Sequence, residues 1–408
     1  MSKKIILALI PCICALMLGI VSGVDEFPFP DCNDYINLSY SLSNNFSFCH
    51  ASIPPAWRTP GYPLSIMLFS WMDGYSFLAA NLLFMFGIGF FTILIAEKWN
   101  VKPLWLISLL LTFSPGLITL VSVPLSEIAF TFFLIAAVYA IIIDRNNISG
   151  ICLSFATLCR PIGMFIFLLF LGWLIRKKKK LVIVLLFVIL ANLLPACWTA
   201  RNYLKYDHSV YTTLGGYHLL YYKAGSYLSW KTGTPLPEIK KQLNVSLQNI
   251  DNPFERSRLA GQLGQKLLLK NFWGFCLWSP RNLVYFFMPD INPLLERLKI
   301  ISGNRGTYDI LRRKGPWAAF NDYFGGNYFA MAIALAYTSF YIIISVLMLL
   351  GIGRFWQKKK YVEILVFICL AFYFMILPLG NLDWRFRMPI VPLSFIFVTA
   401  GWDFVRNR

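Results

Sequence analysis

Two carboxylates and one guanidinium bracket the first long polar stretch of this 408-residue chain. Asp31 and Asp34 stand near its start, and Arg58 lies in the proline-rich sequence WRTPGYP near its end. A carboxylate can take a proton from an attacking hydroxyl group, and arginine binds phosphate oxygens through paired hydrogen bonds. These residue types suit a substrate that has a phosphate group and an attackable centre. Taken alone, Asp31 and Asp34 could equally cap a helix.

A few more ionisable residues lie at the ends of apolar stretches, where charges are costly and indicate function by default. They are Glu127 in VPLSEIAF, Arg160 in LCRPIG, Arg201 in WTARNYL, and Arg385 and Arg387 in NLDWRFRMP. Structural alternatives exist for some of them: Glu127 could stabilise a helix N-terminus, and Arg201 and Arg387 could reach for lipid headgroups. The spacing predicts that all five lie on the same side of a membrane as the first acidic stretch.

The composition predicts an integral membrane protein. The chain is 58% hydrophobic and 14% charged, with a mean hydropathy of +0.61, whereas an average soluble domain is about 25% charged. The apolar residues fall in long runs, which is typical of a multi-pass, all-α integral membrane protein. About ten transmembrane helices are expected, at 4–24, 75–96, 103–122, 124–143, 147–159, 161–175, 181–200, 329–351, 361–379 and 389–405.

Lysine and arginine set the expected orientation. The net charge of +18 would suggest nucleic acid in a soluble protein, but here the basic residues concentrate in alternate short loops, above all in RKKKK at 176–180. Basic loops face the cytoplasm. Both termini are therefore expected in the cytoplasm, and residues 25–74 and 201–328 outside. No nucleic-acid partner is expected.

The first outer loop, 25–74, is expected to carry surface helices. DYINLSYSLSNNF, which starts at Asp34, is amphipathic, and YPLSIMLFSWM is apolar but too short to span easily. In an oxidising compartment Cys32 and Cys49 of this loop could pair. Further along, Pro161 should break the helix that precedes it. Within 201–328, one or two polar helices are expected, followed by an aromatic-rich stretch at headgroup depth.

Other chemistry has little support. There is no glycine-rich phosphate loop, no GxSxG sequence and no pair of Cys or His with metal-ligand spacing; His50, His208 and His218 are scattered. No cofactor and no metal ligands are therefore predicted, and a requirement for a divalent metal is left open.

Five local sequences, in their order, resemble the polytopic glycosyltransferases that use lipid-phosphate sugars (the GT-C fold). The nearest groups are the dolichyl-phosphate-mannose–protein mannosyltransferases and the aminoarabinose transferases of lipid A. The sequences are Asp31 to Tyr35 followed by NLSYSL, RTPGYPL from Arg58, PLSE ending in Glu127, SFATLCRPIG around Arg160, and the pair WTARNYLKYD and WRFRMPIVP. The resemblance is strongest over residues 28–225 and returns at 380–395.

The resemblance implies a GT-C-like catalytic membrane module over 1–225, an extracytoplasmic or interfacial helical segment over 226–328 and C-terminal transmembrane helices over 329–408. It implies an inverting enzyme of the bacterial inner membrane that moves a sugar from a polyprenyl phosphate to a glycan, lipid or protein acceptor at the periplasmic face. Asp31 or Asp34 would be the base and Glu127 a second acid. Arg58 would bind the donor phosphate, with Arg160, Arg201, Arg385 and Arg387 as further candidates.

Two points stay open at this stage. Cys32 stands where the family often has a second acid, so the choice between Asp31 and Asp34 is not made. A polymerase or ligase of surface polysaccharide is an alternative function, and a lipid or solute transporter is a more distant one because no inverted repeat is visible.

Overall fold

The computed structural model describes residues 2–23, 27, 29–301, 310, 314–380 and 383–407. Apart from an isolated bridge between His50 and Ile53, the regular secondary structure of these residues is helical. All ten apolar stretches predicted from the sequence are helical. Among the described residues, five helices are long and apolar enough to cross a membrane. Two of them are counted together with the short 3₁₀ turn that precedes them. They are α1 (Ser2–Ser22), α4 (Ser76–Lys98), α10 (Leu181–Tyr206), α20 (Tyr328–Gln357) and α22 (Val391–Arg406).

The other apolar stretches form shorter or broken helices, so the structure supports five or six spans by length and composition where the sequence predicted about ten. The expected span 103–122 is divided into α5 (Leu104–Thr112) and α6 (Pro115–Val121), which are bent by 65°. Pro115 explains the break, because it lacks an N–H group and holds Ser114 in an extended conformation. The remaining helices of this kind are α7 (Glu127–Ile142), α8 (Asn146–Cys159), α9 (Ile166–Arg176) and α21 (Tyr361–Ile376).

The break at Pro161 is confirmed. Helix α8 ends at Cys159, Arg160 is extended with φ −144° and ψ 128°, and a 3₁₀ turn, η2 (Pro161–Phe165), leads into α9. In contrast, α10 continues to Tyr206, so Arg201 lies inside a helix and not at its end as the sequence suggested.

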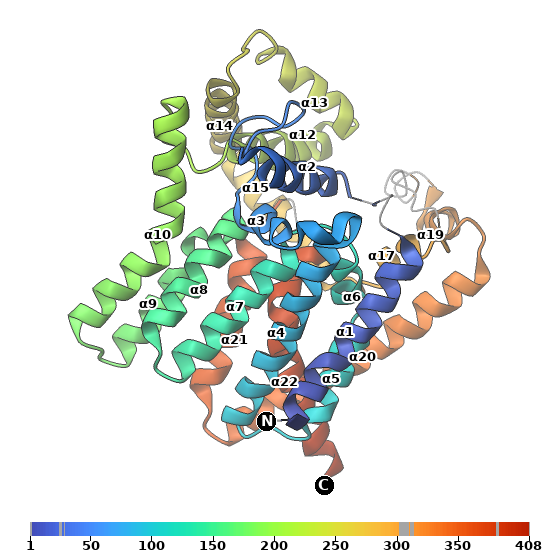
Figure 1. Ribbon diagram of the computed structural model, residues 1–408. Helices are drawn as coiled ribbons and strands as arrows, with labels where there is room; N and C mark the ends of the chain where they lie inside the picture. Colours follow the sequence, from blue (N-terminus) through green and yellow to red (C-terminus); the bar gives the residue numbers. More distant parts are fainter. Residues whose placement is uncertain are drawn as a thin grey trace.

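Helices α2 (Asp31–Asn45) and α3 (Gly61–Met67) of the first outer loop lie across one end of the helix bundle (Figure 1). The pairing of Cys32 with Cys49, which the sequence left open, is not formed, since both are free thiols. Cys32 is the second residue of α2 and is fully buried, whereas Cys49 is exposed in the loop beyond the end of that helix.

The described residues between α10 and α20 form a cap of mostly short helices at the same end as α2 (Figure 1). The polar stretch predicted there is two helices, α13 and α14, and the aromatic-rich stretch is broken into short pieces around Pro280. The described elements are α11 (Leu214–Tyr217), the π-helix η3 (His218–Ala224), α12 (Gly225–Thr232), α13 (Leu236–Val245), α14 (Pro253–Lys270), α15 (Phe272–Trp278), η4 (Ser279–Asn282), α16 (Leu283–Phe287), α17 (Asn292–Arg297) and α19 (Pro316–Phe324).

Both termini lie at the opposite end of the bundle from α2 and α3 (Figure 1). Ion pairs lie at that end: Lys4 pairs with Glu97, and Arg354 pairs with Asp403 near the C-terminus. The chain thus has the termini and the lysine-rich turns at one end, and the loop with Asp31 and Asp34 at the other. Arg408, which also entered the sequence-based orientation, lies outside the described residues.

The core runs through the centre of the bundle, where most of α7 is buried. Helices α20 and α22 approach closely through glycine. A Cβ on Gly351 would lie 1.8 Å from the carbonyl oxygen of Phe397, and one on Gly401 would lie 1.9 Å from that of Leu347. The last transmembrane helix is therefore placed by backbone contact, and the turn η5 (Trp384–Ile390) that precedes it is placed with it.

Candidate active site

The acids of the first loop meet the arginine that ends it. Asp31 and Asp34 are three residues apart in the first turn of α2 and share a face of that helix. The Nη2 atom of Arg58 lies 2.8 Å from Oδ1 of Asp31 and 2.7 Å from Oδ2 of Asp34, and its Nε atom donates to the same Asp34 oxygen at 2.9 Å. One guanidinium thus holds both carboxylates.

The backbone around Arg58 is fixed by contacts to distant segments. The amide of Thr213 donates to the carbonyl of Ala56, and the Thr59 hydroxyl donates to the carbonyl of Cys159 at the end of α8. Gly61 permits this approach, because a Cβ there would lie 2.7 Å from the backbone of Leu158 and Cys159. Arg58 is therefore held beside the break that carries Arg160.

A second ionic group forms where α7 begins. Oε1 of Glu127 lies 2.6 Å from Nη1 of Arg160 and 3.6 Å from Nη1 of Arg385. The Nε atom of Arg385 donates to Asp383 at 3.2 Å. Glu127 is 3% exposed, so this carboxylate is buried between its two arginine partners.

The two ionic groups are joined through Tyr35. Its hydroxyl lies 3.1 Å from the hydroxyl of Ser126, the residue before Glu127, and the guanidinium of Arg58 lies 5.3 Å from its ring. The Tyr35 ring also packs edge-on against Tyr62, whose hydroxyl donates to Asn81 of α4. Asn81 in turn donates to backbone carbonyls of the turn between α6 and α7.

The charges of this network act on Asp31. Burial alone would raise the pKa of its carboxyl group, but the nearby guanidinium groups of Arg58 and Arg385 outweigh burial and hold the pKa below its usual value. Asp31 is therefore ionised at neutral pH. Its side chain is 41% exposed, against 25% for Asp34 and 10% for Arg58, so it is the most accessible of the three.

Six of the eight residues singled out in the sequence therefore belong to one network. The other two lie elsewhere. Arg387 forms a buried pair with Asp290 at 3.2 Å and also donates to the carbonyls of Phe286 and Met288. Arg201 stacks on Trp198 and Tyr206 of its own helix and hydrogen-bonds to Asn202.

Sequence reasoning missed the role of Tyr35 and Ser126 as the link between the halves of the network, and it did not place His218 near Arg58. Burial, followed by the positive charge of Arg58, lowers the pKa of His218 to about 4, so the imidazole is neutral at pH 7. His218 opens the π-helix η3 and follows Tyr217, whose ring contacts Trp57. π-Helices are frequent at functional sites, but HLLYYKA carries no motif that would have shown one.

The described part of the chain holds no group of three or more His, Cys, Asp or Glu side chains arranged to bind a metal ion. The acids of the network face arginines instead.

Comparison with known proteins gives a distant likeness. No protein-family profile matches the sequence, and no curated protein matches it either. Among solved structures, the crystal structure of ArnT from Cupriavidus metallidurans in the apo state is similar to this chain, with a TM-score of 0.41 and 13% sequence identity. The alignment covers 100% of this chain and 78% of that one.

Proposed function

We propose that this protein is a membrane glycosyltransferase of GT-C type that moves a sugar from a polyprenyl phosphate to an acceptor hydroxyl by inversion. The observation that carries the proposal is the network itself. Three carboxylates and three guanidinium groups, supplied by segments up to 354 residues apart, join at the end of the bundle opposite both termini. Charged groups gathered this way at the end of apolar helices mark a functional site.

Asp31 is the better candidate for the base. Asp34 accepts two hydrogen bonds from Arg58, whereas Asp31 accepts one and its side chain is the more exposed of the two. In the proposed step, the Asp31 carboxylate takes the proton of the acceptor hydroxyl. The hydroxyl oxygen then bonds to the anomeric carbon, and the bond from that carbon to the phosphate oxygen breaks.

The leaving polyprenyl phosphate carries negative charge that the site must stabilise. Arg58 is committed to the two aspartates, so Arg160 and Arg385 are better placed for this role than the sequence suggested. A guanidinium has five N–H donors, and Arg160 directs one nitrogen to Glu127. Fixed donors aimed at developing charge are often the largest catalytic term. Glu127 orients both arginines and does not touch the acceptor.

The orientation belongs to the same proposal. We place both termini and the basic turns in the cytoplasm and the network at the periplasmic face of a bacterial inner membrane. The shorter helices α7, α8, α9 and α21 complete about ten membrane crossings, in part tilted or broken. The donor then reaches the network from the outer leaflet.

Separate Asp31→Asn and Asp34→Asn variants test the function. A general base contributes about 10²- to 10⁴-fold to the rate, so Asp31→Asn should lower transfer by that order without loss of folded protein. Asp34→Asn should reduce it less, since it loosens Arg58 but leaves the base. Transfer is measured as the appearance of a new sugar on cell-envelope glycans by mass spectrometry, compared between cells with and without the protein.

Equal, wild-type transfer by both variants and by the Asp31→Asn, Asp34→Asn double variant would refute the assignment of the base. The mass of the product also separates the polymerase or ligase alternative. Addition of a single sugar supports a monophosphate donor, and addition of a preformed oligosaccharide supports a diphosphate-linked glycan donor.

A further inference from the structure

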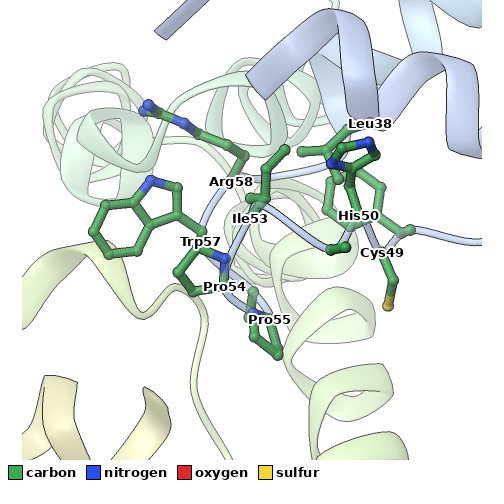
Figure 2. Close-up of a pocket in the computed structure, with 11 residues that line it drawn as sticks. Leu38, Cys49, His50, Ile53, Pro54, Pro55, Trp57 and Arg58 are labelled. Atoms are coloured by element: carbon green, nitrogen blue, oxygen red, sulfur yellow. The ribbon is translucent and has the colours of Figure 1, made fainter. Parts of the chain in front are cut away.

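A cavity of about 250 Å³ lies beside the network, beneath the loop that joins α2 to α3 (Figure 2). Leu38 of α2 closes one side, and the loop residues His50, Pro54, Pro55 and Trp57 line the rest. Arg58 also lines it, and this residue connects the cavity to the acids. The cavity is smaller than the sites that hold drug-sized ligands, which start at roughly 300 Å³.

The cavity adjoins the face of α2 that carries the acids, although neither aspartate lines it. Leu38 follows Asp34 by one helical turn on α2, and residues four apart lie on the same face of a helix, about 5–6 Å apart. The guanidinium of Arg58 points away from His50 and Cys49 in Figure 2 and ends on Asp31 and Asp34. Arg58 thus lies between the cavity and the two acids, so a glycan with one ring in the cavity reaches them with a neighbouring part that extends past Arg58.

The lining selects a neutral ligand. Among the lining residues, all of which the structure describes, Arg58 alone carries a permanent charge, and that charge is already paired. Prolines, Ile53 and Trp57 supply apolar surface. His50 supplies a polar group: its Nδ1 atom lies 2.8 Å from the Ser52 hydroxyl, which leaves Nε2 for another partner. Apolar faces with a few polar edges match a pyranose ring better than a phosphate.

The cavity walls are held in place before any ligand binds. Ala56 adopts a left-handed conformation with φ +53°, which is costly for a residue other than glycine. The hydrogen bonds from Thr213 to Ala56 and from the Thr212 hydroxyl to the carbonyl of Trp57 keep this turn closed. The Trp57 ring packs edge-on against Tyr217, 4.9 Å between centroids.

We propose that this cavity is the acceptor subsite and that the acceptor presents an uncharged pyranose ring to it. The proposal rests on the glycosyltransferase function above and narrows its acceptor to a glycan, or to a glycolipid through its sugar. The donor phosphate then belongs to Arg160 and Arg385, on the other side of the two aspartates.

Cys49 offers a direct reporter of occupancy, because it lines the cavity and is exposed. Its sulfur lies 3.2 Å from the hydroxyl of Tyr206 and 3.4 Å from Nζ of Lys205. Burial alone would raise the pKa of the thiol, but the hydrogen bonds from Tyr206 and Lys205 lower it below its usual value. The thiolate is the reactive form, so Cys49 should alkylate readily.

The experiment measures the rate at which a maleimide alkylates Cys49 in the purified full-length protein, held in a detergent without a sugar headgroup. Cys49→Ser gives the background from the other eight cysteines. The probes are methyl glucoside, methyl galactoside and methyl mannoside, with glycerol at equal concentration as the control and glucose 1-phosphate as the charged comparison. At least one methyl pyranoside should slow alkylation several-fold, and more than glucose 1-phosphate does.

An Ala51→Trp variant completes the test, since Ala51 lines the cavity and is itself exposed. It should remove protection by the pyranoside and raise the KM for acceptor. Failure of every pyranoside to protect Cys49, or protection by farnesol in their place, would overturn the proposal. Labelling needs no turnover, so the two proposals can fail separately. If no pyranoside protects Cys49 but Asp31→Asn lowers transfer as expected, the subsite alone is rejected. If a pyranoside protects Cys49 but Asp31→Asn transfers at the wild-type rate, the assignment of the base alone is rejected.

Discussion

At the scale of single residues, the pairing of one arginine with two aspartates decides how the site responds to pH. Arg58 is the charge that lowers the pKa of Asp31 most strongly against the opposing effect of burial. A carboxyl whose folded-state pKa is depressed contributes stability that is complete above the unfolded pKa and is lost as the pH falls through the folded one. The same titration removes the base.

An Arg58→Gln variant should therefore move the acid limb of the pH–rate profile to higher pH. With the guanidinium gone, burial acts with less opposition and the pKa of Asp31 rises. The profile of kcat/KM against pH measures the shift, and Arg58→Lys is the control, because it keeps the positive charge. An acid limb at the same pH in all three proteins would show that Asp31 is not the titrating base.

Arg387 behaves as a structural residue in this arrangement. It is 7% exposed, and its partner Asp290 also accepts from the amide of Gly116 and the hydroxyl of Tyr337. Arg387→Met would leave a buried carboxylate without a counterion, a defect of about 3–5 kcal/mol. The thermal midpoint of unfolding should fall accordingly.

Replacing both partners should restore part of that loss, since Arg387→Met with Asp290→Asn leaves no unpaired charge. Transfer per folded molecule should be near that of the wild type in the double variant. If Arg387→Met unfolds like the wild type and yet loses transfer, Arg387 takes part in the chemistry.

At the scale of helices, the crossing of α20 and α22 depends on two small residues. Gly351→Ala places a methyl group against the backbone oxygen of Phe397, and a backbone atom cannot turn aside. Overpacking of this kind costs about 1–3 kcal/mol. The variant should lower the thermal midpoint, and activity with it, because η5 and Arg385 are attached to α22.

Gly353→Ala is the matched control. It lies two residues further along the same helix, and a Cβ there meets nothing within 4 Å. Alanine is also the better helix former by about 1 kcal/mol, so this variant should be as stable as the wild type or more so. Equal destabilisation of both variants would mean that the contact with the Phe397 carbonyl oxygen does not set the effect.

At the scale of the whole molecule, the position of the termini and of the lysine-rich turns at one end makes a prediction about sidedness. A membrane-impermeant maleimide added to intact spheroplasts should label Cys49. It should not label a cysteine introduced at Asn407 beside the C-terminus, in a Cys49→Ser background, until the membrane is opened. Labelling of Asn407→Cys in closed spheroplasts, with Cys49 protected, would reverse the orientation proposed here.

The sequence predicts most of this architecture, because apolar runs and prolines act locally. Each of the ten apolar stretches is helical, and the helix that precedes Pro161 ends there as expected. The break at Ser114–Pro115 follows the same rule and could have been predicted from it. The lengths of the spans could not, since they depend on how far each helix is packed within the bundle.

The site is predictable in its residue types and not in its pairings. Asp31, Asp34 and Arg58 are close in the sequence and meet in the structure. In the sequence, Arg387 looks equivalent to Arg385. Both lie in the same 3₁₀ turn, but the side chain of Arg387, two residues further on, contacts Asp290, which is 97 residues away in the sequence. Nothing in the local sequence distinguishes the two arginines.

The hydrogen bond between Tyr35 and Ser126 has a mechanical consequence. Through it, and through Tyr62 and Asn81, the helix with the aspartates is braced against the turn that carries Glu127. Moving α2 away from the bundle would break the hydrogen bond between Tyr35 and Ser126 and disturb both halves of the network, so we do not expect α2 to move as a hinged segment. Substrates should thus enter between α2 and the cap of short helices, without a movement of α2 away from the bundle.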